Sequence, residues 1–110
     1  MAEERISEII SFLLNCLKND SVNVDRIILF GSNLNDTARE ESDLDIGIIS
    51  KDFNNKDIFE RSKLVFNAER ITIKQFMVPL DIVMLTPKEL SSEASLIASY
   101  LNNGKVIFSV

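Results

Sequence analysis

Asp43 and Asp45 are the first residues whose type and spacing could carry out chemistry. They open the segment D-L-D-I-G-I-I-S, whose alternation of polar and apolar residues is typical of a half-buried strand. Side chains alternate between the two faces of a strand, so both aspartates share one face, opposite Leu44, Ile46 and Ile48. Carboxylates at this spacing lie about 6 to 7 Å apart along the backbone and can converge on one metal ion.

Two further features could belong to the same site. Asp81 lies inside the apolar run P-L-D-I-V-M-L, where an acid is unfavourable unless it is exposed at an edge, paired or bound to a cation. Gly31 and Ser32 directly follow another apolar run, where backbone N–H groups can bind phosphate and glycine permits close approach. An edge position facing water explains Asp81 alone equally well, surface charge explains the Asp43 and Asp45 pair alone better, and Gly31-Ser32 alone is weak evidence. Together they describe a site for a metal-bound polyphosphate.

Helices and strands must position these residues. Apolar residues at three- and four-residue spacing predict a first helix that ends near Asn19. These apolar residues are Ile6, Ile9, Ile10, Leu13, Leu14 and Leu17. A second helix is predicted from about residue 56, after a loop over 52–55, with Ile58, Val65, Ala68 and Thr72 on one side. Strands are predicted over 25–30, 43–50, 79–85 and 106–108.

A capping pattern marks the start of the last predicted helix. Thr86, Pro87 and Glu89 form a capping-box arrangement, and the helix is expected to run to about Asn103, with Gly104 closing it. Strands that alternate with helices predict an α/β fold, in which helices pack on a single sheet.

Composition narrows the chemistry further. The chain has 110 residues, which fits a single domain over 1–110, and a net charge of −5 with no histidine. Any metal is therefore expected to be a hard cation on oxygen ligands. The acidic balance argues against extended nucleic-acid binding. Cys16 is the only cysteine, so the chain has no internal disulfide, which favours a reducing, cytoplasmic location. The sequence shows neither an apolar stretch long enough to span a membrane nor a secretory signal, so we expect a soluble protein without membrane attachment.

The combined motif resembles the nucleotidyltransferases of the DNA polymerase beta superfamily, most closely its minimal nucleotidyltransferase (MNT) members. The family signature is an apolar strand, Gly-Ser, a short spacer, Ser-Asp-x-Asp and a third acid in a later strand. It is matched by Leu29, Phe30, Gly31, Ser32, Ser42, Asp43, Asp45 and Asp81. The resemblance covers nearly the whole chain and implies the nucleotidyltransferase fold, with a small mixed β-sheet.

The resemblance implies roles for these residues. Gly31, Ser32 and Ser42 would bind the nucleotide, while Asp43, Asp45 and Asp81 would be both catalytic and metal-binding, with Mg²⁺ as cofactor. The implied reaction is Mg²⁺-dependent transfer of a nucleoside monophosphate, AMP from ATP, onto a hydroxyl of a partner protein. Minimal members commonly pair with a small helical HEPN-type protein in toxin–antitoxin modules and act as the antitoxin.

Two other interpretations stay open. Family members often carry Ala-Arg-Gly soon after Gly-Ser, whereas this chain has Leu34-Asn35-Asp36, and Arg39 is the nearest replacement for the lost positive charge. That departure favours a catalytically inactive module that neutralises a partner by contact. A third interpretation is a Mg²⁺-nucleotide sensor. Apolar stripes on the first or last predicted helix also suggest association with a partner or with a second copy, although burial in the core explains the stripe of the first helix better. The stripes are Ile6, Ile10, Leu13 and Leu17, and Leu96, Ile97, Tyr100 and Leu101.

Overall fold

The computed structural model describes residues 3–31 and 43–110. Its elements are α1 (Glu3–Asn19), β1 (Arg26–Phe30), β2 (Leu44–Ile49), the 3₁₀ turn η2 (Lys51–Phe53), α2 (Ile58–Phe76), β3 (Leu80–Leu85), α3 (Pro87–Leu90), α4 (Leu96–Asn102) and β4 (Lys105–Ser109). None of the helices within these two ranges is both long and apolar enough to cross a membrane.

The four strands form one mixed sheet in the order β3-β2-β1-β4. β1 pairs antiparallel with both β2 and β4, while β2 pairs parallel with β3. The parallel pair needs a crossover, and α2 provides it by running between the two strands in sequence. The α/β fold with a small mixed sheet is therefore confirmed.

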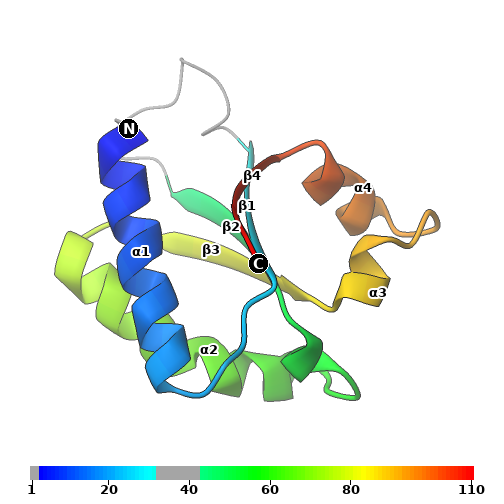
Figure 1. The fold of residues 1–110 in the computed structure, drawn as a ribbon, viewed down its shortest axis with the longest axis horizontal. Coiled ribbons are helices and arrows are strands. Elements are labelled where there is room, and N and C mark those ends of the chain that lie inside the picture. Colours follow the sequence, from blue (N-terminus) through cyan, green and yellow to red (C-terminus); the bar gives the residue numbers. More distant parts are fainter. Residues whose placement is uncertain (1–2, 32–42) are drawn as a thin grey trace.

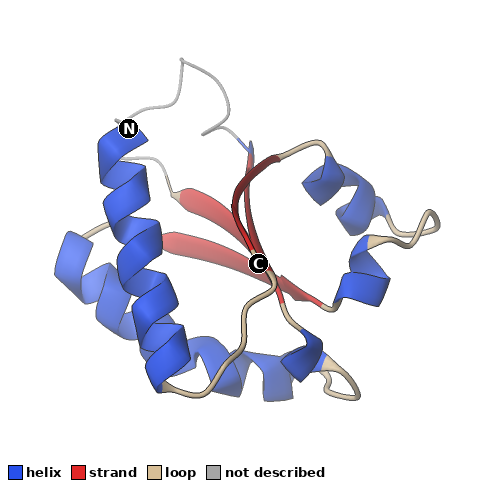
Figure 2. Cartoon of the chain, viewed as in Figure 1, coloured by secondary structure: helices blue, strands red, loops and turns tan. Residues whose placement is uncertain are grey.

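Helices cover both faces of the sheet (Figures 1 and 2). α1 and α2 pack on one face, and α3 and α4 lie on the other. The face under α1 and α2 holds Leu44, Ile46 and Ile48, all fully buried. Asp45 lies on the opposite face of the same strand, because side chains alternate along it. The alternation predicted for this segment is confirmed.

Local signals fix where the helices begin. Asp57 caps α2, accepting a bond from the Glu60 N–H, while the Glu60 side chain accepts one from the Asp57 N–H. Thr86 and Glu89 form the predicted capping box at α3. Reciprocal caps of this kind satisfy donors that the first helical turn leaves unpaired.

Three predictions about the elements are wrong. Residues 52–55 are not simply loop, because Lys51–Phe53 forms a 3₁₀ turn with Phe53 fully buried. Ile58 faces solvent, with 66% of its surface exposed, because none of the other described elements covers this first residue of α2. The helix predicted from Pro87 to about Asn103 is two helices, because the chain turns after Leu90 and Ser95 caps a new helix.

Arg61 ties α2 to α3. Its guanidinium lies 2.7 Å from the Glu89 carboxylate and donates to the carbonyls of Lys56 and Met84. Its side chain is only 13% exposed. Hydrogen bonding from Arg61 is the main reason that the pKa of Glu89 lies below its usual value. This group of contacts joins the helix on one face of the sheet to the strand end and helix on the other.

Replacement of Arg61 by methionine is expected to destabilise the protein by about 1–3 kcal/mol, because it removes the bonds that Arg61 donates to Glu89 and to two carbonyls. Urea unfolding measures this loss, with the exposed Arg70→Met as the matched control. A lowered carboxyl pKa contributes stability above its unfolded value and loses it as the pH falls through the folded one. The difference in the free energy of unfolding between wild type and variant should therefore become smaller at acidic pH. Equal losses for both variants would contradict this assignment.

Candidate active site

All four strands have an end at one edge of the sheet, and three of them carry the candidate site. β1 finishes there at Phe30, and β2 and β3 both begin there. Phe30 pairs with Asp45 across the antiparallel ladder, and Asp45 pairs with Asp81 across the parallel one. Residues paired directly across a sheet project from the same face. The sheet thus brings Asp45 and Asp81, separated by 36 positions in sequence, into one row with the end of β1.

Gly31 continues this row by turning the chain sharply after β1. Its φ is +75°, a left-handed conformation that residues with a Cβ rarely adopt. A Cβ at this position would overlap the Asp45 carboxylate. Glycine is therefore required for two separate reasons: the backbone conformation and the space occupied by Asp45.

The acids affect one another electrostatically. Burial raises the pKa of Asp45, and the charges of Asp81 and Asp43, together with a hydrogen bond to Asp81, raise it further. Asp45 is half-buried, whereas Asp81 is exposed on β3, the edge strand of the sheet. The arrangement concentrates negative charge at a point open to solvent on the β3 side.

Glu69 is a further acid of this region that the sequence did not single out. It lies in α2 and is partly buried. Burial raises its pKa, and the charge of Asp81 adds to the effect. The sequence offers one weak signal, since Glu69 follows Ala68 on the side of α2 that faces the sheet and is therefore not fully solvated.

The donor set fits a hard divalent cation. Asp43, Asp45 and Asp81 offer carboxylate oxygens, the ligands that Mg²⁺ prefers. Burial and then the charges of Asp81 and Asp43 raise the pKa of Asp45, and a bound cation would relieve the repulsion among the charges. Across residues 3–31 and 43–110, no three or more His, Cys, Asp or Glu side chains form a ready-made metal cluster. Asp45 and Asp81 are the close pair, and the charge of Asp43 reaches Asp45.

Two of the predicted nucleotide-binding residues, Ser32 and Ser42, lie outside the described residues. So do Leu34-Asn35-Asp36 and Arg39, on which the inactive alternative depends. Gly31, the third predicted nucleotide-binding residue, lies against Asp45.

The two helices expected to offer surplus apolar surface behave differently. Ile6, Ile10, Leu13 and Leu17 are all buried in the core, which is the interpretation that the sequence favoured for the first helix, so these residues offer no surface for association. They are needed to cover the sheet. On α4, by contrast, Leu96, Ile97 and Tyr100 are exposed, while Leu101 is buried.

The chain matches the family model described as "Polymerase beta, Nucleotidyltransferase" over residues 12–110. That span is most of the sequence and includes all three strand ends of the site. The protein belongs to the polymerase beta nucleotidyltransferase family, as its motif suggested. No curated protein sequence matches the chain significantly.

Solved structures show the same fold at low sequence identity. A nucleotidyltransferase candidate from Sulfolobus solfataricus is 17% identical, with a TM-score of 0.60 over 99% of this chain and 90% of that one. A toxin–antitoxin structure with AMP-PNP is 19% identical, with a TM-score of 0.62 over 100% and 75%. A mutant of the toxin–antitoxin MntA-HpeT is 16% identical, with a TM-score of 0.59 over 100% and 75%.

Proposed function

We propose that this protein is a minimal nucleotidyltransferase that transfers AMP from ATP to a hydroxyl of a partner protein, as the antitoxin of a toxin–antitoxin pair. The observation that carries the proposal is the row formed by Gly31, Asp45 and Asp81 at one end of the sheet. A glycine turn beside paired carboxylates suits a triphosphate with its metal, since exposed backbone N–H groups bind phosphate.

In this proposal, phosphate binding and metal binding are roles of different residues in the row. Gly31 would bind the phosphates on the β1 side, and Ser32 and Ser42 are the other two residues that we propose for nucleotide binding. Asp43, Asp45 and Asp81 would hold Mg²⁺, which when bound neutralises the phosphate charge and activates the acceptor hydroxyl. Asp81, exposed on the open edge of the sheet, is accessible to an acceptor arriving from outside.

The transfer step then needs positioning and a proton acceptor more than a covalent intermediate on the protein. The acceptor oxygen attacks the α-phosphorus and forms the new P–O bond. The bond from that phosphorus to the bridging oxygen of the β-phosphate breaks, and pyrophosphate leaves. Asp81 takes the proton of the hydroxyl, which a carboxylate can do in a chain without histidine.

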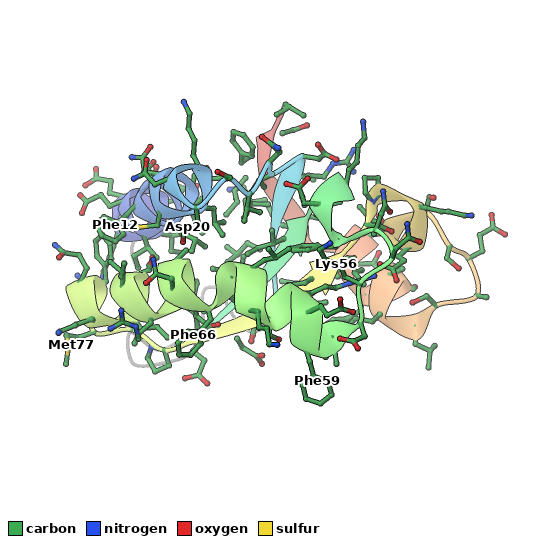
Figure 3. All side chains as sticks on the ribbon, turned by 90° about the horizontal axis from the view of Figure 1, so that it is seen from below. Phe12, Asp20, Lys56, Phe59, Phe66 and Met77 are labelled. Carbon is green, nitrogen blue, oxygen red and sulfur yellow. The ribbon has the colours of Figure 1, made fainter. Side chains whose placement is uncertain are left out.

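Support for a protein partner comes from the surface and from similar structures. Phe59 and Phe66 are seven residues apart on α2 and are 76% and 62% exposed. Phe59 projects from α2 away from α1 (Figure 3). Exposed aromatic side chains of this kind favour an interface. Two of the similar structures are toxin–antitoxin structures, one of them with the adenine nucleotide AMP-PNP. We propose a small helical HEPN-type protein as the partner.

ATP and Mg²⁺ together are expected to raise the melting temperature more than either alone, because metal and triphosphate complete one site. A ligand at a hundred times its Kd adds about 2.7 kcal/mol of stability, which for a chain of this size corresponds to roughly 10 °C or more. Differential scanning fluorimetry measures the shift. No shift would remove both the enzyme and the sensor interpretations and leave the module that acts by contact.

ATP labelled at different phosphates distinguishes nucleotidyl transfer from nucleotide binding alone. With the co-purified partner present, label from the α-phosphate of ATP should enter the partner, while label from the γ-phosphate should leave as pyrophosphate. A protein that moved the γ-phosphate instead would be a kinase. Binding without any labelling would support the sensor.

A further inference from the structure

We propose that Tyr100 is the ring on which the nucleobase of the bound nucleotide stacks, an inference that rests on the proposed function of the site. Tyr100 belongs to α4, on the same face of the sheet as Asp45. Its ring packs edge to face against Phe30, with centroids 5.6 Å apart and planes at 81°. Phe30 pairs with Asp45 and immediately precedes Gly31.

These contacts place Tyr100 on the nucleotide side of the row. The order along the sheet is β3, β2, β1, so Asp81 lies at one end of the row and Phe30 at the other. Tyr100 lies beyond Asp45, on the side away from Asp81 and the acceptor. The phosphates would sit near Gly31, which follows Phe30 on the β1 side of the row, so the base can extend toward Tyr100 without meeting the acceptor.

Two close approaches fix the position of α4 over the sheet. A Cβ on Gly47 would come within 2.5 Å of Leu101 Cδ2, so the helix lies directly against the glycine of β2. A Cβ on Gly104 would come within 2.6 Å of the Leu29 carbonyl oxygen, which holds the end of the helix against β1. The end of α4 that follows Tyr100 is therefore held against both β2 and β1.

The Tyr100 ring is held in place by Phe30 but remains accessible to solvent. Tyr100 keeps 55% of its surface exposed although Phe30 contacts it and its neighbour Leu101 is fully buried. An aromatic ring that is anchored at one edge and open to solvent loses little freedom when a base stacks on it, and every base offers a π face for such stacking. Tyr100 would thus strengthen nucleotide binding without selecting strongly among bases.

Binding measurements with and without a base test the proposal. Tyr100→Leu keeps apolar bulk but removes the aromatic face, so it should weaken Mg²⁺–ATP about tenfold and leave Mg²⁺–tripolyphosphate unchanged. Tyr100→Phe should bind ATP like wild type. Leu96→Ala, exposed one turn earlier on α4, is the matched control and should change neither affinity.

Fluorescence gives a second readout, because Tyr100 is the only tyrosine and the chain has no tryptophan. Mg²⁺–ATP should quench this emission after correction for adenine absorbance, and Mg²⁺–tripolyphosphate should not. If tripolyphosphate binds while ATP neither quenches Tyr100 nor distinguishes the leucine variant, stacking is refuted and the phosphate site stands. If neither compound binds, the proposed function fails and the stacking role fails with it.

Discussion

Asp45→Asn is expected to leave the metal-free protein at least as stable as wild type near neutral pH, and to abolish both the Mg²⁺-dependent stabilisation by ATP and nucleotidyl transfer. The amide keeps the size of the side chain but removes one of three neighbouring negative charges. Relief of that repulsion should offset any lost hydrogen bond in the folded protein. The same charge is needed to hold the metal, so stability and function should move in opposite directions.

The raised pKa of Asp45 also predicts the direction in which stability changes with pH. The folded pKa of Asp45 is raised, chiefly by burial and then by Asp81 and Asp43. The folded protein therefore binds the proton more tightly than the unfolded chain, and stability falls as the pH rises from the unfolded value through the folded one. Asp45→Asn should remove this fall, so its advantage over wild type should appear only above that window.

Urea unfolding across pH, without metal, measures the effect, and scanning fluorimetry with Mg²⁺ and ATP measures the loss of binding. Glu93→Gln, an exposed acid between α3 and α4, is the matched control and should change stability by no more than about 0.5 kcal/mol. If Asp45→Asn behaves like that control and keeps the metal response, Asp45 is surface charge. A large loss of stability without metal would instead indicate a structural hydrogen bond.

Gly31→Ala is expected to reduce both stability and nucleotide binding strongly. An alanine in the left-handed region is unfavourable by about 1–2 kcal/mol, and its Cβ would also displace the Asp45 carboxylate. The two contributions differ in origin, since the first depends only on the backbone and the second only on the neighbouring side chain.

A double-mutant cycle separates them. In an Asp45→Ala background the overlap with the carboxylate is removed and only the tight contact with the Cβ of residue 45 remains, so Gly31→Ala should there cost little more than the backbone contribution. Urea unfolding of the four proteins gives the coupling energy. Full additivity would mean that Gly31 and Asp45 do not constrain each other. Retained Mg²⁺–ATP binding in Gly31→Ala would contradict the role of this turn in the site.

The sequence by itself determined the strands, most helix boundaries and the family. Alternation around Asp43 and Asp45 predicted which face of β2 each residue occupies, and the capping box at Thr86 predicted the start of α3. These signals succeed because they depend on neighbours within one helical turn or along one strand. Gly31 was likewise recognisable, since the turn after β1 requires a residue without a Cβ.

Only the tertiary structure decided which distant residues meet. The parallel register places Asp81 beside Asp45, where a shift of one residue would have turned it to the other face of the sheet. Glu69 and Tyr100 join the region through the packing of α2 and α4, which no local pattern specifies. Phe53 is buried and Ile58 exposed against expectation for the same reason. Periodicity reports where a side chain points within its own element, whereas burial depends on which other element covers it.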